Sequence, residues 1–241
     1  MFCLLVLFFI FVGLNNQLMR KLYFLTMAII GLSFASQAQI TKGSTFLGGS
    51  FSFSSGSGET ASPVDYKRES FGWGIRPQFG KAIATNKVLG LYVHYSNSGY
   101  EQKLGSTNII DEGSSYGGGV FLRNYYPLNS RFSLFGDGSF GVGINSSERK
   151  ENAVLTGKNN ATDISLGITP GISFAAGKKL HLEASLNSLL SVAYSFSESS
   201  TYNASGAVVN KGNERQFNIG ANANGFSGLS VGLRWILPSK G

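Results

Sequence analysis

The sequence predicts an all-β protein that folds as an eight-stranded antiparallel up-and-down transmembrane β-barrel. Three observations lead to this prediction: eight segments alternate apolar and polar residues, their connections alternate in length, and aromatic residues gather near both ends of the segments. Charged residues form only 14% of the 241 residues, against about 25% in an average soluble domain. The aromatic content of 13% argues against a disordered chain, because disordered segments are poor in aromatic residues.

The first element, residues 1–38, has the pattern of an export signal. Met19 is followed by two basic residues, residues 22–34 are apolar, and small residues stand at the two positions that signal peptidase recognises before a cut after Ala38. We therefore expect a signal peptide that is removed after Ala38. Residues 39–241 then form the outer-membrane β-barrel domain.

A second apolar run, residues 2–14, lies upstream of this signal. It is too short to cross a membrane, for which about 20 apolar residues are needed. We expect translation to start at Met19, and an uncleaved N-terminal anchor is the alternative. The single cysteine, Cys3, lies in this run, so we expect neither a disulfide framework nor a cysteine-based metal site.

Eight segments of the mature chain alternate with a period of two. They are residues 47–54, 71–80, 89–96, 116–126, 132–145, 164–174, 181–196 and 217–235. When the apolar residues alone define the outer face of each strand, eight ionisable residues fall on the inner face: Arg76, His94, Arg123, Asp137, Asp163, His181, Glu183 and Arg234. An arginine that faces lipid at mid-depth costs ~2–4 kcal/mol, so this sorting indicates that the outer face lies in lipid.

The connections between the strands are alternately short and long. The short ones are residues 84–87, 127–131 and 176–179, and the long ones are residues 56–69, 101–111, 147–161 and 198–215. Short periplasmic turns and long extracellular loops are typical of outer-membrane barrels. We therefore expect four long extracellular loops and both chain ends in the periplasm.

The aromatic residues near the strand ends form two girdles in this topology. The periplasmic girdle holds Phe79, Tyr126, Phe132, Phe174 and Trp235, and the extracellular girdle holds Phe53, Phe71, Trp73, Tyr95, Tyr116, Tyr194, Phe196 and Phe217. Aromatic rings prefer the two interfaces of a membrane. A soluble β-sandwich would also alternate, but its polar face would be the outer one.

The signal peptide, the eight strands and the closing strand, residues 228–235, together resemble the small outer-membrane barrels of Gram-negative bacteria, the OmpA/OmpX/OmpW-like porin-family barrels. The resemblance covers residues 44–237 and is one of pattern, without a diagnostic motif. The closing strand of that family commonly ends in a terminal aromatic residue, whereas here six residues follow Trp235. The resemblance implies a location in the cell outer membrane, reached by export through the periplasm.

Six residues of the inner face form the candidate site, a polar network in the barrel lumen: Arg76, His94, Arg123, Asp137, Glu183 and Arg234. The first two flank one short turn symmetrically and the next two flank another, so each pair should be cross-strand neighbours. The last two lie at similar heights on adjacent strands. Buried charges need partners, and two interpretations stay open: a structural plug or the gate of a narrow pore.

Two prolines on the outer face, Pro77 and Pro170, interrupt the strand pattern. Proline cannot donate to the hydrogen-bond ladder, so each marks a bulge or a local gap. Such a gap is either a packing kink or a lateral opening for a hydrophobic solute.

Catalysis is not expected from this chain, although His94 and His181 invite the comparison with outer-membrane lipid hydrolases. Such an enzyme needs a nucleophile or an acid within reach of the histidine and access for its substrate, and His181 lies near a periplasmic turn. We expect no enzyme activity and no cofactor.

The function predicted from the sequence is a structural or surface-interaction role through the four long extracellular loops. The alternative is a narrow channel or small-solute transporter. Large inward side chains, among them Tyr92, Phe121, Tyr125, Phe135 and Leu189, should fill an eight-stranded lumen. We expect a monomer in contact with outer-membrane lipid, with an extracellular ligand or a small solute as its partner. No basic run exceeds two residues, so nucleic acid is not expected as a partner.

Overall fold

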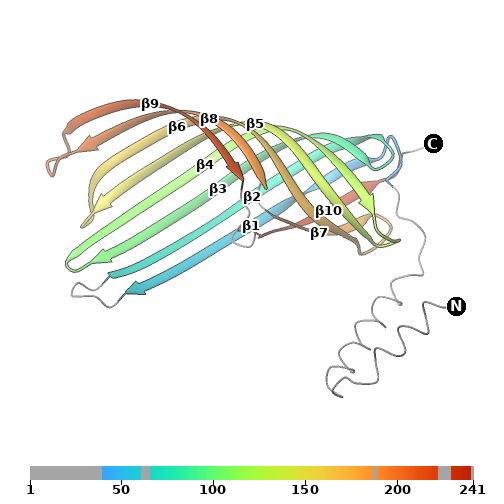
Figure 1. Ribbon diagram of the computed structural model, residues 1–241, viewed down its shortest axis with the longest axis horizontal. Helices are drawn as coiled ribbons and strands as arrows, with labels where there is room; N and C mark the ends of the chain where they lie inside the picture. Colours follow the sequence, from blue (N-terminus) through green and yellow to red (C-terminus); the bar gives the residue numbers. More distant parts are fainter. Residues whose placement is uncertain (1–39, 61–65, 187–188, 222–228, 240–241) are drawn as a thin grey trace, which may run out of the picture.

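The computed structural model describes residues 40–60, 66–186, 189–221 and 229–239, and every regular element in these ranges is a β-strand (Figure 1). The predicted signal peptide, with its start at Met19 and its cleavage after Ala38, lies outside the described residues. The strands are β1 (Thr45–Thr60), β2 (Tyr66–Ala84), β3 (Lys87–Leu104), β4 (Thr107–Pro127), β5 (Phe132–Glu151), β6 (Val154–Ala175), β7 (Leu180–Leu186), β8 (Leu190–Tyr202), β9 (Val208–Ala221) and β10 (Leu229–Leu237).

Eight of these strands form a closed antiparallel ring at the end of the molecule that carries the short turns, which the sequence predicts to be the periplasmic end. The order around the ring is β1-β2-β3-β4-β5-β6-β7-β10, and β10 returns to β1 from Thr45↔Leu237 to Ser52↔Ser230. Each strand of the ring pairs with both neighbours, which removes exposed sheet edges as a membrane-spanning barrel requires. The predicted eight-stranded barrel is confirmed.

Two of the predicted strands are divided in the structure. The predicted seventh strand corresponds to β7 and β8, and the predicted eighth strand corresponds to β9 and β10. β6 pairs with β7 over residues 171–175 and with β8 over residues 157–168. The division lies beside Pro170 of β6, where proline cannot donate to the ladder.

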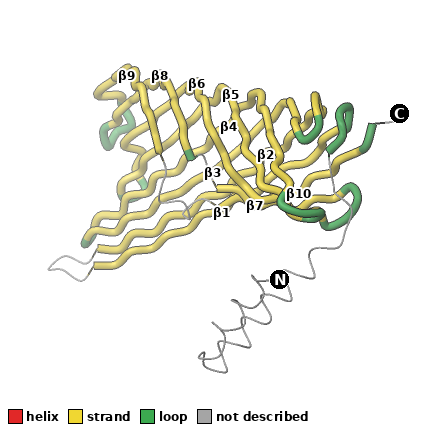
Figure 2. The backbone as a smooth tube through the Cα atoms, turned by 45° about the vertical axis from the view of Figure 1, so that its right-hand side comes forward, coloured by secondary structure: helices red, strands yellow, loops and turns green. Residues whose placement is uncertain are grey.

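Over the described residues, the extracellular half is a curved sheet rather than a closed ring. Among the described residues, β1 beyond Ser52 pairs only with β2, and β9 pairs only with β8. Figures 1 and 2 show β9 and the far half of β1 on opposite sides of the molecule. The strands β2 to β6 project with them well beyond the ring.

The connections that were expected to be long loops are β-hairpins, which corrects the prediction. Strands continue to tight turns at residues 105–106, 152–153 and 203–207. The remaining connection, between β1 and β2, includes residues 61–65, which lie outside the described residues. Asn152 and Ala153 have φ of 47° and 67°, as a type I′ hairpin turn requires. The prediction missed these strands because both of their faces carry polar residues, so the sequence shows no hydrophobic period there.

The outer surface of the barrel is apolar. On β3, Leu89, Leu91 and Val93 are 48%, 60% and 59% exposed, whereas the alternate residues Val88 and Tyr92 are buried. A soluble protein rarely exposes a continuous apolar band of this kind, and lipid is its natural solvent. Among the described residues, no helix has the length and hydropathy to cross a membrane. The chain is therefore a transmembrane β-barrel of the outer-membrane type.

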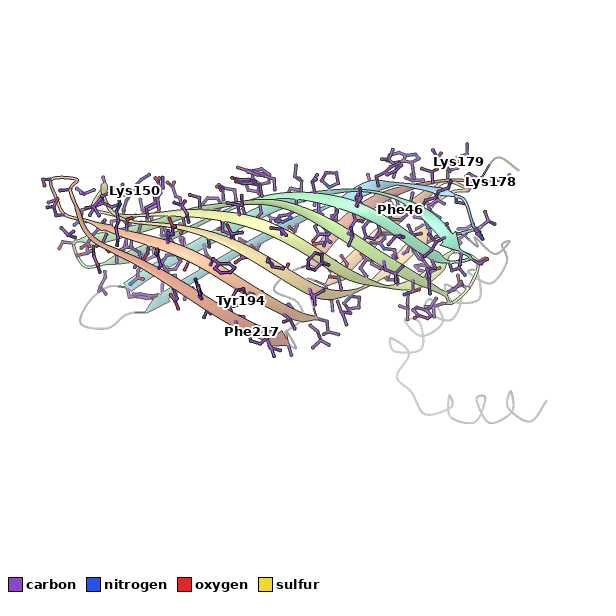
Figure 3. All side chains as sticks on the ribbon, turned by 90° about the horizontal axis from the view of Figure 1, so that it is seen from above. Phe46, Lys150, Lys178, Lys179, Tyr194 and Phe217 are labelled. Carbon is purple, nitrogen blue, oxygen red and sulfur yellow. The ribbon has the colours of Figure 1, made fainter. Side chains whose placement is uncertain are left out.

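Both ends of the apolar band carry aromatic residues. Phe79, Tyr126 and Trp235 are exposed near the periplasmic end, and Trp73 and Tyr95 pack with ring centroids 5.5 Å apart near the other end. Figure 3 shows lysine side chains at the two ends of the molecule, Lys178 and Lys179 at one and Lys150 at the other, with Tyr194 and Phe217 between them. Rings at the interfaces and charges beyond them are the expected order along a bilayer normal.

The apolar core lies inside the periplasmic half of the barrel. Its buried residues are Ile40, Phe46, Ala82, Val88, Tyr92, Phe121, Tyr125, Phe135 and Ile236. The segment before β1 closes the mouth of the barrel, because Ile40 exchanges hydrogen bonds with the side chain and backbone of Asn86 at 3.1 and 2.9 Å. The lumen is filled at this end.

Candidate functional site

An ion pair between Arg123 of β4 and Asp137 of β5 lies at the centre of the lumen. The two residues face each other in the β4–β5 register, and both are almost fully buried. Arg123 Nε donates to Asp137 Oδ1 at 2.5 Å and Nη2 donates to Oδ2 at 2.6 Å. This two-pronged geometry is the strongest that an arginine makes with a carboxylate.

The same arginine also holds a second carboxylate, that of Glu183 on β7. Arg123 Nη1 lies 2.8 and 2.7 Å from the two oxygens of Glu183. The hydroxyl of Tyr125 accepts a bond from Nη1 at 3.1 Å and donates to Glu183 Oε1 at 2.8 Å. Every polar atom of the Arg123 guanidinium is therefore satisfied, and the contact joins β4 to β7 across the lumen.

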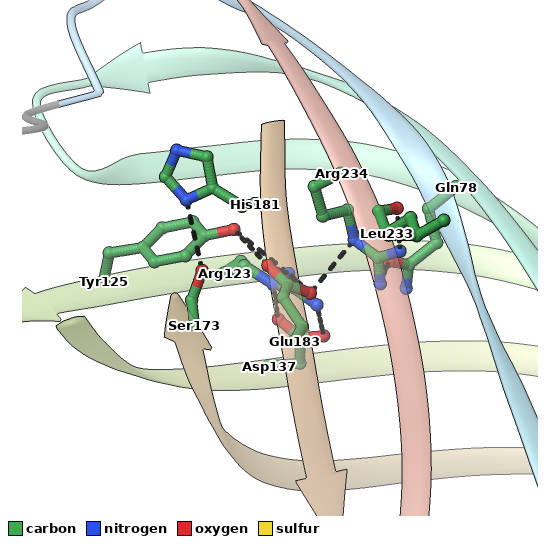
Figure 4. A network of polar contacts seen from close by, with 9 residues as sticks. All are labelled: Gln78, Arg123, Tyr125, Asp137, Ser173, His181, Glu183, Leu233 and Arg234. Carbon is green, nitrogen blue, oxygen red and sulfur yellow. Dashed lines mark hydrogen bonds and ion pairs between the residues drawn. The ribbon is translucent and has the colours of Figure 1, made fainter. Parts of the chain in front are cut away.

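Arg234 of β10 completes this cluster (Figure 4). Its Nε lies 3.1 Å from Glu183 Oε2, an ion pair whose angle falls outside hydrogen-bond geometry. Its Nη2 donates to Gln78 Oε1 at 2.7 Å, and its Nη1 donates to the Leu233 carbonyl at 3.0 Å. The structure thus brings four of the six predicted residues together: Arg123, Asp137, Glu183 and Arg234.

The other two predicted residues, Arg76 and His94, do not bond to each other. The guanidinium of Arg76 stacks on the ring of Tyr92, 3.7 Å from its centroid. His94 Nε2 lies 3.4 Å from Ser115 Oγ. The β2–β3 pairing is interrupted between Ile75↔Tyr95 and Gln78↔Tyr92, so Arg76 and His94 lie at a break in the ladder.

Arg76 differs from the other two lumen arginines. Its Nε and Nη2 are shielded from solvent, and neither atom has a hydrogen-bond partner among the described residues. A buried donor without an acceptor costs about 1–3 kcal/mol, and more where it is charged. Arg76 therefore has two donor nitrogens without a hydrogen bond, whereas Arg123 has none and Arg234 has only Nε, which still lies 3.1 Å from Glu183 Oε2.

Sequence reasoning missed Phe46 and Gln78. Phe46 is 1% exposed, and its ring packs against Phe121 with centroids 5.8 Å apart. The guanidinium carbon of Arg123 lies 5.2 Å from the Phe46 ring centroid and 4.1 Å from that of Phe135. The signal for both residues was present, because Phe46 precedes the outward Leu47 and Gln78 is in phase with Arg76.

A cavity of about 210 Å³ lies in the lumen beside this cluster. All eight strands of the ring contribute to its wall, and its charged lining residues are Arg76, Arg123, Asp137 and Arg234. Most of the remaining lining residues are small or polar, and they include Ser50, Ser52, His94, Ser96, Thr169, Ser185 and Ser230. The cavity is polar and its lining carries more positive than negative groups.

His181 does not form a catalytic pair with Glu183. Its Nδ1 lies 3.2 Å from Ser173 Oγ, whereas the carboxylate of Glu183 is bonded to Arg123 and Tyr125. Within the described ranges, no group of three His, Cys, Asp or Glu side chains has a geometry that could hold a metal ion.

Both prolines interrupt the ladder on one side of their strand. Pro77 pairs with Gly49 of β1 but falls in the break between β2 and β3. Pro170 pairs with Gly136 of β5, while on its other side β6 pairs with β8 only to Ile168 and with β7 only from Gly171. Each proline therefore marks a local break in the hydrogen-bond ladder.

Comparisons with known proteins gave structural likenesses only. No protein-family model matches the chain, and no curated protein matches it. The chain is similar to Neisserial surface protein A (NspA), with 16% identity over 79% of this chain and 96% of that one, at a TM-score of 0.37. It is similar to the outer membrane protein OprG from Pseudomonas aeruginosa, with 12% identity over 85% and 100% of the two chains, at a TM-score of 0.45. It is also similar to the translocator domain of the autotransporter NalP from Neisseria meningitidis, with 11% identity over 91% and 94%, at a TM-score of 0.27.

Proposed function

We propose that this outer-membrane barrel has a structural or surface-interaction role, with its extracellular hairpins as the working surface. The observation that supports it is the filled lumen. Phe46, Phe121 and Arg123 are each 1% exposed and Val88 is 0% exposed. Eight strands enclose a lumen just wide enough for side chains, so these residues leave no continuous path for a solute.

Ion pairs between neighbouring hairpin strands give the hairpins the fixed structure that a binding surface needs. Arg149 of β5 donates two bonds to Asp111 of β4, at 2.7 and 2.9 Å, and Lys150 donates to Glu112 at 2.9 Å. The Asp111 carboxylate, through its hydrogen bonds and its charge, raises the pKa of Arg149. Each exposed pair stabilises by no more than about 1 kcal/mol, but together such pairs keep the projecting strands in register.

Two measurements on cells and liposomes test the proposal. Liposome swelling with the refolded protein is expected to show no flux of sugars or amino acids. Cells that carry a variant in which residues 147–161 are replaced by a two-residue turn are expected to lose surface adhesion while their permeability stays unchanged. Heat-modifiable migration in gels serves as the control that the shortened barrel still folds. Solute flux through the wild type, together with unchanged adhesion of the variant, would contradict the proposal.

A narrow channel or small-solute transporter is the second candidate. The ladder breaks beside Pro77 and Pro170 favour it, because strands that are not hydrogen-bonded to each other can part and open a lateral route that avoids the filled lumen. Pro77→Val would allow the β2–β3 ladder to close. If the wild type conducts a solute and Pro77→Val abolishes that flux in planar bilayers, the channel function is the correct one.

A further inference from the structure

The periplasmic half of the lumen holds one more guanidinium group than carboxylate groups. Arg123 and Arg234 lie within 3.1 Å of the oxygens of Asp137 and Glu183, so these two positive and two negative charges neutralise one another. Farther along the lumen, Asp163 accepts a hydrogen bond from Asn145. Arg76 is thus the charge without a counter-charge in the central cluster.

The two unsatisfied atoms of Arg76, Nε and Nη2, are the pair through which an arginine binds both oxygens of a carboxylate. In Arg123, Nε and Nη2 hold the two oxygens of Asp137 at 2.5 and 2.6 Å. In Arg76, the same Nε and Nη2 have no acceptor among the residues that the structure describes. The ring of Tyr92 lies 3.7 Å from the Arg76 guanidinium carbon and covers one flat face of the group, which holds its plane.

The cavity next to Arg76 suits a small oxyanion. Its volume of about 210 Å³ is below the ~300–1,000 Å³ of sites for drug-sized ligands, so it fits a group of only a few heavy atoms. The serine and threonine hydroxyls of its wall can donate further hydrogen bonds. Asp137, its only lining carboxylate among the described residues, is occupied by Arg123.

We propose that the barrel binds a small oxyanion, a carboxylate or a phosphate, in this lumen cavity, with the side chain of Arg76, which lines the cavity, as its principal ligand. The anion enters from the extracellular side, because Phe46 and Phe121 fill the lumen on the periplasmic side. Ser54 and Ser98, on the inner face beyond the cavity, are exposed and leave that approach open. The site is independent of the hairpins and of their proposed surface role.

Calorimetric titration of the refolded mature barrel in detergent tests this site, with sodium acetate, sodium phosphate and sodium chloride as probes at constant ionic strength. Acetate or phosphate is expected to bind saturably at one site per chain. Which of the two binds shows whether the ligand is a carboxylate or a phosphate. Arg76→Gln is expected to weaken that binding at least tenfold. Arg76→Lys, which keeps the charge but loses the planar guanidinium that stacks on Tyr92, is expected to weaken it as well.

The matched control is Arg131→Gln, which removes an exposed arginine at a periplasmic turn and is expected to leave the affinity within twofold. Each variant is first checked for heat-modifiable migration. If Arg76→Gln fails to fold, side-chain NMR of the wild type replaces it, and the Arg76 Nε resonance is expected to shift on addition of acetate or phosphate. The proposal is overturned if both anions behave like chloride, if Arg76→Gln binds as the wild type does, or if that resonance stays unmoved.

Discussion

Replacing Asp137 with alanine tests whether the lumen cluster stabilises the barrel. The change removes both oxygens that Arg123 Nε and Nη2 contact at 2.5 and 2.6 Å, while Glu183 still binds Nη1. Two lost hydrogen bonds to charged groups, at about 1.5–3 kcal/mol each, correspond to the ~3–5 kcal/mol that breaking a buried ion pair costs. We expect Asp137→Ala to lower the free energy of unfolding by about 3–5 kcal/mol.

Denaturant unfolding in lipid vesicles measures this change, with the fluorescence of Trp73 and Trp235 as probes near the two ends of the barrel. Asp111→Ala is the matched control, because Asp111 forms the same two-pronged pair with Arg149 but on the surface. The Asp111 and Arg149 side chains are 28% and 61% exposed, so we expect this control to cost about 1 kcal/mol or less.

A double variant separates the unpaired buried charge from a general loss of packing. Arg123→Met in the Asp137→Ala background removes the guanidinium that has lost one of its two carboxylate partners, and Glu183 keeps Arg234. The two changes together are expected to destabilise less than the sum of the single changes. The reasoning is refuted if Asp137→Ala costs no more than the surface control, or if the two changes are additive.

Three further predictions concern the strand wall, a hairpin and the N-terminus. Gly119→Ala should destabilise the barrel by ~1–3 kcal/mol in the same unfolding assay, because a Cβ there would overlap a backbone carbonyl oxygen of β5; unchanged stability would show that the strands part easily. The hydrogen bond and the charge of Lys67 lower the pKa of Glu69 below 4.5. The stability from this contact is therefore present at neutral pH and is lost as the pH falls through that lowered pKa. An NMR titration of Glu69 should give a midpoint below 4.5, and this midpoint should return to the ordinary value in Lys67→Gln. Intact mass of the membrane-inserted protein should match a chain that begins at Gln39, and a mass that includes residues 19–38 would disprove the predicted cleavage.

The number of strands in the closed ring and the orientation of their side chains could be predicted from the sequence. In a barrel wall, each residue faces either lipid or the lumen, and that choice follows from its own polarity and from the period of two. This is why Arg123, Asp137, Glu183 and Arg234 were assigned to the lumen without a structure. The short turns also set cross-strand partners, so Arg123 and Asp137 were expected to face each other.

The polar hairpins could not be predicted as strands, because their two faces both meet water and no hydrophobic period marks them. Apart from their tight turns, residues 101–111 and 147–161 have strand geometry because the neighbouring strands continue, through cross-strand pairs such as Glu112 with Lys150. Pairing of this kind depends on the partner strand and not on local polarity.

Contacts across the lumen depend on how the barrel closes. Arg123 meets Glu183, 60 residues away, because the stagger of the ring brings β4 and β7 to the same height. Arg76 and His94 flank the turn at residues 84–87 symmetrically in the sequence. They do not bond to each other, because the strand pairing is interrupted at Pro77 and Arg76 stacks on the ring of Tyr92. Local alternation determines which side chains enter the lumen, whereas closure and stagger of the whole sheet determine which of them meet, since those distances are set by strands far apart in the chain.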